Sequence, residues 1–176
     1  LKDTFPEWEQ LERAKAHQVA AVIKPAGLHR QKARVILSLL SSVRREAGEL
    51  SLDQLRSMDD AQAEHFLLRL PGMSWKGARC VLLYALDRAV FPVDVNTFRI
   101  FKRTRLITPT EIYRRKYVHD SLQRAVPAEL RRPLHVNLVH HGRQVCRPRG
   151  PACSNCPLSR MCPKVDIPTE TPHGIH

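Results

Sequence analysis

Four cysteines near the end of the chain have the spacing of a metal-binding loop. Cys146, Cys153, Cys156 and Cys162 fall within 17 residues, in a stretch that is rich in proline. Four thiolates so close together can hold a zinc ion or a 4Fe–4S cluster. Structural zinc sites usually combine two short Cys-x2-4-Cys pairs and this loop has one, so the spacing favours the cluster modestly and leaves zinc open. A metal site rather than a disulfide framework predicts a reducing compartment.

Lys76 and Asp94 are the side chains that could carry covalent chemistry. Lys76 stands in the first turn of an expected helix, where the helix dipole favours the free amine that nucleophilic attack requires. Phosphate binding is the simpler role for a lysine in that place. Asp94 follows 18 residues later and could cap the next helix or stabilise positive charge on a reacting sugar. Spacing alone leaves these roles open.

The segment Leu70-Pro71-Gly72-Met73-Ser74 is a tight turn between two expected helices. A glycine lets the backbone approach a phosphate, and the amide N–H groups that open the next helix attract an anion. The turn therefore indicates a phosphate-binding helical hairpin, although an ordinary hairpin would have a similar sequence.

The elements that must position these residues all show helical periodicity. Apolar residues recur at three- and four-residue spacing, and no alternating run is long enough for a convincing strand. The chain is therefore expected to be all-α, with a frayed tail over 168–176 that includes His173 and His176. The expected helices cover 8–23, 29–47, 53–55, 60–70, 75–86, 96–103, 108–126 and 128–145.

Charge and hydropathy narrow the class of protein further. The 176 residues contain 29 Lys and Arg against 17 Asp and Glu, a net charge of +12, which indicates a polyanionic partner such as nucleic acid. No apolar run approaches the roughly 20 residues of a membrane helix. The chain starts at Leu1 without a signal peptide, and we expect it to begin partway into a larger gene product.

Together, the hairpin, the Lys–Asp spacing and the x6, x2, x5 cysteine loop resemble the endonuclease III family of helix–hairpin–helix DNA glycosylases. Ile23-Lys24-Pro25-Ala26-Gly27-Leu28, Lys32-Ala33 and His141-Gly142-Arg143 are similar to family segments at the equivalent places. The resemblance spans about residues 5 to 165.

This resemblance implies two helical lobes with double-stranded DNA in a groove between them. A helical barrel lobe would cover 1–91, with the helix–hairpin–helix at about 61–86, and a cluster lobe would cover 92–167. Lys76 would attack C1′ of a flipped nucleotide with help from Asp94. The four cysteines of the loop would hold one 4Fe–4S cluster as structural support.

The resemblance also implies DNA contacts. Gly72, Met73 and Ser74 would hold phosphate through backbone N–H groups, Leu28 would be an intercalating wedge, and Arg147 and Arg149 would face the DNA backbone. The protein would be an intracellular monomer without a membrane partner, in the cytoplasm or nucleoid of a prokaryote or the nucleus or an organelle of a eukaryote.

Under the resemblance, the function would be that of a bifunctional DNA glycosylase and apurinic/apyrimidinic (AP) lyase for damaged or modified pyrimidines. A monofunctional mismatch glycosylase and a non-catalytic iron–sulfur DNA-binding module remain alternatives. Ser74, Gly77 and Asn96 replace the Gly, Thr and His usual in the family. Asp-x-Asn resembles the adenine-mismatch and plant 5-methylcytosine branches, whereas Lys76 is unlike the adenine-mismatch branch. The family's first helices have no counterpart, so the barrel is expected to be incomplete and marginally stable alone.

Overall fold

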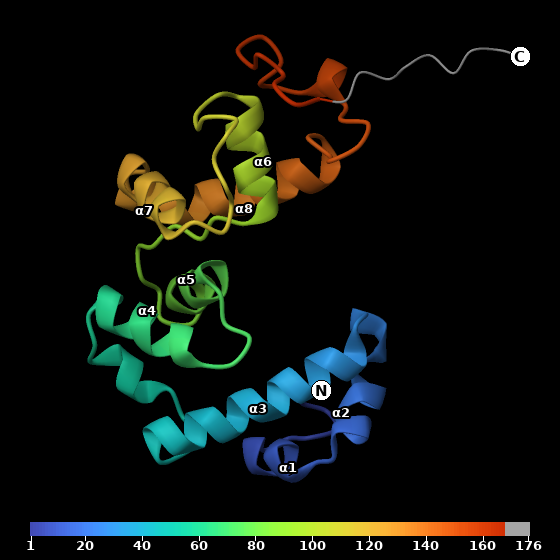
Figure 1. Ribbon diagram of the computed structural model, residues 1–176, viewed down its shortest axis with the longest axis vertical. Coiled ribbons are helices and arrows are strands. Elements are labelled where there is room, and N and C mark those ends of the chain that lie inside the picture. The colour runs from blue at the N-terminus through green and yellow to red at the C-terminus, as the bar shows by residue number, and fades with distance from the viewer. Residues whose placement is uncertain (168–176) are drawn as a thin grey trace, which may run out of the picture. The chain divides into compact units, whose positions relative to one another are not determined.

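The computed structural model describes residues 1–167, and every regular element in that range is a helix (Figure 1). The expectation of an all-α protein is confirmed. The expected frayed tail, with His173 and His176, lies outside the described residues. No helix in the described part is long and apolar enough to cross a membrane.

Contacts between Cα atoms divide the chain into two compact units, Leu1–Ser74 and Trp75–His176. The division falls within the hairpin turn, earlier than the expected lobe boundary after residue 91. Lys76, Asp94 and the cysteine loop consequently belong to the second unit, and Leu28 and Gly72 belong to the first. The division into lobes at 91 stays a prediction.

The first unit contains four α-helices and two short 3-10 helices. They are α1 (Trp8–Arg13), α2 (Ala16–Val22), η1 (Lys24–Ala26), α3 (His29–Ala47), η2 (Asp53–Arg56) and α4 (Asp60–Arg69). Its core joins α1, α2 and α3 through Leu11, Val19, Ala33 and Leu40. Helix α3 has the predicted bounds and ends where Gly48 adopts a left-handed conformation.

The single helix expected over 8–23 is wrong, because the chain breaks between α1 and α2. Ala14 and Lys15 are extended, with ψ of 148° and 146°. The Gln18 side chain accepts a hydrogen bond from the Lys15 amide N–H at 2.8 Å. This bond satisfies an amide at the start of a new helix, so α2 can begin one residue later.

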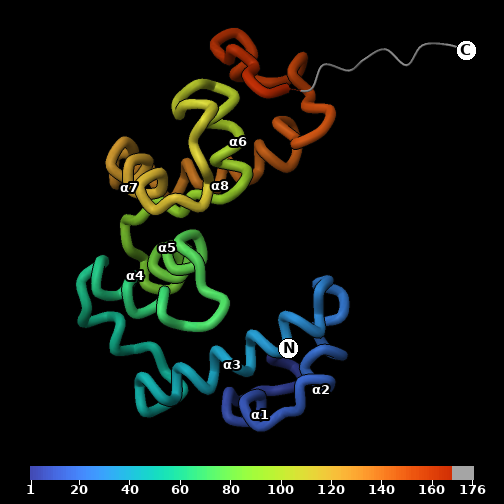
Figure 2. The backbone as a smooth tube through the Cα atoms, in the orientation of Figure 1, coloured from blue at the N-terminus to red at the C-terminus, as the bar shows by residue number. Residues whose placement is uncertain are grey.

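The second unit contains α5 (Trp75–Tyr84), α6 (Val95–Arg103), α7 (Lys116–Ala125), α8 (Ala128–Gln144) and the short η3 (Cys153–Asn155). The helix expected from 108 is wrong in its start, because the chain turns between 104 and 115 and α7 begins only at Lys116. The apolar residues that α7 buries, Val118 and Leu122, both lie after this start. Figure 2 follows the backbone from α8 into the loop that carries the cysteines.

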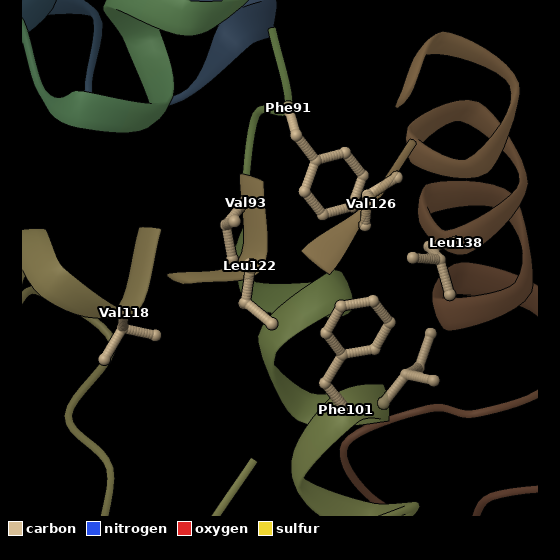
Figure 3. Packing of buried hydrophobic residues seen from close by; sticks show 8 residues of the cluster. Phe91, Val93, Phe101, Val118, Leu122, Val126 and Leu138 are labelled. Atoms are coloured by element: carbon tan, nitrogen blue, oxygen red, sulfur yellow. The ribbon is translucent and has the colours of Figure 1, made fainter. Parts of the chain in front are cut away.

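The core of the second unit packs α6, α7 and α8 around the segment that leads to Asp94. Phe91 and Phe101 stack with ring centroids 6.3 Å apart (Figure 3). Val93, one residue before Asp94, is fully buried in the same cluster. The backbone that carries Asp94 is therefore held by a packed core rather than by a surface loop.

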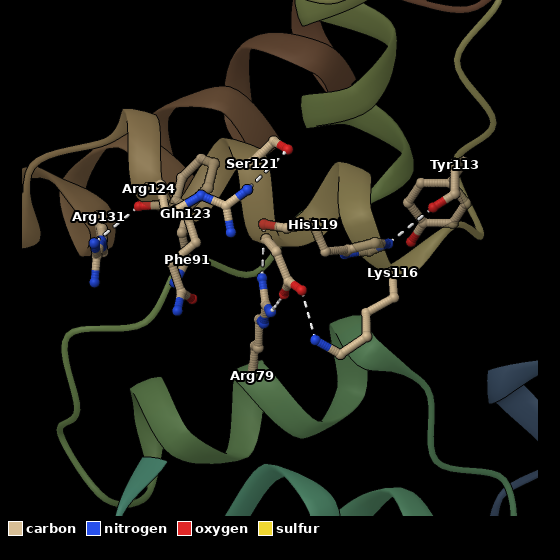
Figure 4. Close-up of polar contacts among 10 residues, drawn as sticks. Arg79, Phe91, Tyr113, Lys116, His119, Ser121, Gln123, Arg124 and Arg131 are labelled. Atoms are coloured by element: carbon tan, nitrogen blue, oxygen red, sulfur yellow. Dashed lines mark hydrogen bonds and ion pairs between the residues drawn. The ribbon is translucent and has the colours of Figure 1, made fainter. Parts of the chain in front are cut away.

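A buried arginine joins α5 to α7. Arg79 is 2% exposed and reaches toward α7 (Figure 4). Its guanidinium donates to the His119 carbonyl at 2.8 Å and pairs with the Asp120 carboxylate at 2.5 Å. Breaking one side of such a buried pair leaves an uncompensated charge, so this contact strongly specifies how α5 sits on α7. Since α5 also carries Lys76, the contact helps to place that amine.

Candidate active site and cysteine loop

Lys76 is the second residue of α5 and is half-buried. Cys80 stands one helical turn further along α5, near enough for the charge of Lys76 to influence its ionisation. Burial raises the pKa of Cys80 above its usual value, and the nearby Lys76 only partly opposes this. The side chain of Cys80, the neighbour of Lys76 on α5, is therefore a neutral thiol rather than a thiolate.

Asp94 is the N-cap of α6 and both of its carboxylate oxygens are engaged. Oδ1 accepts from the Thr97 backbone N–H at 2.8 Å, and Oδ2 accepts from Asn96 Nδ2 at 2.7 Å. Burial raises the pKa of this 9% exposed carboxyl, but the bonds from Thr97 and Asn96 outweigh it and the net pKa is below the usual value. The capping role left open by the sequence is confirmed, and the group that caps the helix is a fixed, ionised carboxylate.

Lys76 and Asp94 act on the same two neighbours. The charges of both residues influence the ionisation of Cys80 and of His135, a 3% exposed residue of α8. Burial lowers the pKa of His135, and the negative charge of Asp94 opposes this only in part. An amine and an ionised carboxylate of the second unit thus both influence the same two side chains, and nucleophilic attack on a sugar with charge stabilisation uses groups of these two kinds.

A line of hydrogen bonds leads from Asp94 to the first cysteine of the loop. Asn96 donates to Asp94 and accepts from Arg99 Nη2 at 2.8 Å. Arg99 in turn donates to the Cys146 carbonyl through Nε at 2.9 Å and to the Gly142 carbonyl through Nη2 at 2.9 Å. Sequence reasoning missed Arg99, although an arginine one turn after Asp-x-Asn in an amphipathic helix was the signal available.

Gly142 is where α8 approaches Asn96. A Cβ at Gly142 would lie 2.5 Å from Asn96 Cβ, a distance that real side chains do not reach. Any larger residue must therefore move Asn96 or α8. The glycine in His141-Gly142-Arg143, quoted above only for its family resemblance, thus has a packing role beside Asp94.

The four cysteines line one small cavity of about 20 Å³. Within residues 1–167, no three His, Cys, Asp or Glu side chains are arranged to hold a metal ion. Each thiolate of a 4Fe–4S cluster binds a different iron, so its four sulfurs are spaced more widely than around one zinc ion. Four cysteine sulfurs beside one pocket supply the number of ligands that a 4Fe–4S cluster requires.

A buried cation lies beside the same cavity. Arg103 is 3% exposed, and its Nη1 lies 3.3 Å from Cys146 Sγ while its carbonyl accepts from Cys162 Sγ at 3.4 Å. Its guanidinium also donates to the Arg147 and Pro148 carbonyls at 2.7 and 3.0 Å. Among the described residues no carboxylate pairs with Arg103. A buried guanidinium facing cysteine sulfurs fits an anionic group in the cavity.

The hairpin turn differs from a simple phosphate cradle. Gly72 has φ +76°, and a Cβ there would lie 2.4 Å from Val35 Cγ1 of α3, so packing as well as the turn requires glycine. The Met73 backbone N–H donates to the Leu70 carbonyl at 3.2 Å. Fewer amides are therefore available to a phosphate than the three that the resemblance implies for Gly72, Met73 and Ser74.

Leu28 and the loop arginines lie on the surface of their units. Leu28 is 73% exposed in a left-handed conformation (φ +49°) at the start of α3. Such a backbone is costly for leucine, and a large exposed apolar side chain held this way is often functional. In the second unit, Arg147 and Arg149 line a basic groove with Arg143, and Asn96 borders it. The second unit thus places two predicted DNA contacts near the hydrogen-bond partner of Asp94.

Known structures share this fold. Three solved structures cover at least 89% of the chain: a non-covalent endonuclease III–DNA complex (TM-score 0.76, 23% identity, 72% of that chain), a trapped endonuclease III–DNA covalent intermediate (0.75, 23%, 73%) and a thermostable thymine-DNA glycosylase (0.73, 24%, 68%). At these identities the similarity shows the fold.

Curated relatives agree. A protein of Arabidopsis thaliana whose name assigns it provisionally as a DNA glycosylase is 32% identical over 95% of this chain, which spans 54% of that relative. Endonuclease III of Thermotoga maritima is 29% identical over 92% of this chain and 70% of its own length. The DNA glycosylase/AP lyase ROS1 of Arabidopsis thaliana is 26% identical over 89% of this chain, which spans only 12% of ROS1.

The model of the HhH-GPD superfamily, described as base excision DNA repair protein, matches residues 1–127, well over half of the chain. That range includes the helical hairpin, Lys76 and Asp94. By its sequence and its fold, the chain is a member of the HhH-GPD superfamily of base excision DNA repair glycosylases.

Proposed function

We propose that this chain carries the catalytic centre of a bifunctional DNA glycosylase and AP lyase that removes damaged or modified pyrimidines from double-stranded DNA. The observation that carries the proposal is the geometry of one unit, in which a half-buried Lys76 opens α5 and Asp94 caps α6 with both carboxylate oxygens held by hydrogen bonds. The names of two relatives support it, since one is endonuclease III and another is a DNA glycosylase/AP lyase.

The proposed reaction begins when the target nucleotide leaves the base stack, so that C1′ becomes accessible. The free amine of Lys76 forms a bond to C1′ while the bond from C1′ to the base breaks, and the base departs with the electron pair and gains a proton. Asp94 stabilises the positive charge that develops on the sugar. Ring opening gives a Schiff base, loss of a C2′ proton expels the 3′ phosphate, and the strand is nicked.

We further propose that Cys146, Cys153, Cys156 and Cys162 hold one 4Fe–4S cluster. When bound, the cluster would tie the loop to its surroundings and add to folding free energy. The buried Arg103 beside the sulfurs supports this assignment. Protein prepared without air should contain about four irons with equal acid-labile sulfide, and Cys156→Ser should lose both. Stoichiometric zinc without sulfide would overturn the assignment.

Borohydride trapping tests the main proposal. The purified chain is incubated with duplexes that contain an oxidised pyrimidine, uracil or thymine opposite guanine, or 5-methylcytosine, and the Schiff base is reduced. A covalent protein–DNA adduct that is absent from Lys76→Gln supports the bifunctional mechanism. Base release without an adduct favours a monofunctional mismatch glycosylase, for which the Asp94-x-Asn96 pattern is the favourable observation. Binding without base release favours a non-catalytic module.

The proposed partner is duplex DNA. We propose that the protein binds it as a monomer, in the cellular compartment that contains the DNA. The net charge of +12 supports an anionic partner. We propose that Leu28 is the wedge that enters the base stack, and that the DNA backbone is contacted by Arg147 and Arg149. We also propose that the Gly72–Ser74 turn binds phosphate and that the two lobes divide after residue 91.

A further inference from the structure

The first unit contains a basic groove that none of the predicted DNA contacts occupies. It lies along α2 and the start of α3, and its volume of about 670 Å³ far exceeds the ~30 Å³ share of a water molecule. The groove can therefore take an extended ligand rather than a single ion. Alanines and two histidines line it together with three cations, Lys24, Arg30 and Arg34.

The helical spacing of these residues produces the groove. Ala16, Ala20 and Lys24 follow at four-residue intervals along α2 and η1, and Arg30 and Arg34 are one turn apart on α3. Alanine side chains are short, so a ligand can approach the α2 backbone between the longer basic side chains. The core residues Val19 and Ala33 hold α2 against α3.

The three cations are not committed to the fold. Within residues 1–167, the side chains of Lys24, Arg30 and Arg34 make no hydrogen bond or ion pair. By contrast, Arg44 on the same helix α3 binds the Glu12 carboxylate at 2.8 Å. No acidic residue lines the groove. Uncompensated positive charge in a concave surface raises the local potential and attracts a polyanion.

We propose that this groove, lined by Lys24, Arg30 and Arg34, binds the phosphate backbone of duplex DNA next to Leu28. The inference rests on the proposed function, because it takes duplex DNA as the substrate. Lys24 precedes Leu28 by four residues, and His29 and Arg30 follow it directly, so lining residues of the groove flank the exposed leucine along the chain. A strand whose stack Leu28 enters would have its neighbouring phosphates within reach of this rim.

A change in the salt dependence of DNA binding tests the groove. The Arg30→Gln/Arg34→Gln double variant is compared with the parent on an undamaged duplex, by fluorescence anisotropy at several salt concentrations. Each lost phosphate contact should reduce the slope of log K against log salt by about 0.9, so the double variant should lose about 1.8. Damaged and undamaged duplexes should be weakened alike, because phosphate contacts read no base.

The control variant removes the same charge away from the groove. Arg13→Gln/Arg45→Gln changes an exposed arginine of α1 and a 71% exposed arginine of α3, neither of which lines the groove. It should keep the parental slope. An equal loss of slope in the control, or an unchanged slope in the groove variant, would overturn the proposal. Circular dichroism confirms that both variants keep the helices.

Hydroxyl-radical footprinting on a duplex with an abasic analogue supplies the position. The groove variant should lose protection at sugars beside the lesion while protection elsewhere remains. A parent that binds duplex DNA but releases no base contradicts the proposed function and leaves the groove intact. A parent that releases base with a footprint identical to that of the groove variant contradicts the groove alone.

Discussion

The charges of Lys76 and Asp94 influence the same two side chains, Cys80 and His135, but the two residues have different roles in the proposed reaction. Lys76→Gln should abolish borohydride trapping and strand nicking, because the amine is needed for covalent chemistry. Asp94→Asn should keep the helix cap, since Asn caps as well as Asp, but it removes the negative charge. Base release by Asp94→Asn should fall by ~10²-fold or more. Borohydride trapping measures the effect of Lys76→Gln. Single-turnover assays of base release measure the effect of Asp94→Asn.

Asp59 provides a matched control for Asp94. It caps α4 in the same way, with its carboxylate accepting from the Gln62 backbone N–H at 2.8 Å. Asp59→Asn should leave base release at the parental rate, and all three variants should still bind a duplex with an abasic analogue. An adduct formed by Lys76→Gln at the parental level would place the nucleophile on another residue.

Asn96 should influence the pH below which the reaction rate falls, because it hydrogen-bonds the Asp94 carboxylate. Its amide helps to hold the pKa of Asp94 below the usual value, so Asn96→Ala should raise that pKa. Asp94 must be ionised to stabilise positive charge, and a higher pKa means that protonation begins at a higher pH as the solution is acidified. The acid limb of the pH–rate profile should therefore move to higher pH, with about a tenfold loss of rate on that limb.

Asn137, exposed on α8, supplies the comparison for this profile. Asn137→Ala should reproduce the parental acid limb. If Asn96→Ala also reproduced it, the hydrogen bond from Asn96 to Asp94 would have no influence on the reacting state.

At the scale of elements, the contact between α6 and α8 depends on Gly142. Glycine to alanine normally stabilises a helix by up to about 1 kcal/mol, because it reduces the freedom of the unfolded chain. Here the added Cβ would lie 2.5 Å from Asn96 Cβ, so Gly142→Ala should instead destabilise the protein by about 1–3 kcal/mol. Chemical denaturation measures the sign directly.

Val136→Ala is the control for this contact, because Val136 is 48% exposed on the same helix. Its effect should stay within about 0.5 kcal/mol. A stabilising Gly142→Ala would mean that Asn96 and α8 can separate without cost, and that the close approach does not matter for stability.

The helices also show which parts of the structure could be predicted from the sequence. Helix α3 has its predicted bounds because its periodicity, its length and Gly48 agree with one another. The break at Ala14 depends on one hydrogen bond, which the Gln18 side chain accepts from the Lys15 backbone N–H. Hydrophobic periodicity carries no information about such a bond. The late start of α7 follows burial at Val118 and Leu122, which only tertiary packing decides.

The same limit applies to the candidate site. Lys76, Asp94 and the cysteines stand in local motifs, so their types and spacing identify them. Arg99 and His135 act through contacts with segments more than 40 residues away in the chain. No local pattern predicts such contacts. The basic groove beside Leu28 was missed for a related reason, because it forms only when α2 packs against α3.

At the scale of the whole molecule, acid stability should depend on His135. Burial lowers the pKa of this residue in the folded protein, whereas in the unfolded chain it has its ordinary value of about 6.5. Below that pH the unfolded chain binds a proton that the folded protein does not. The free energy of unfolding should therefore fall as pH decreases from 7.5 to 5.5.

Denaturation at several pH values in this range separates His135 from other groups. Asp94 and Asp120 also have lowered pKa values, but carboxylates lose their contribution at pH values below about 4, outside the range. Burial also lowers the pKa of His141, which therefore contributes to the same fall. His135→Gln should therefore show a smaller fall than the parent between pH 7.5 and 5.5. Asn137→Ala, a change at an exposed position on the same helix, should keep the parental fall. A parental fall in His135→Gln would mean that another group in the molecule takes up the proton on unfolding.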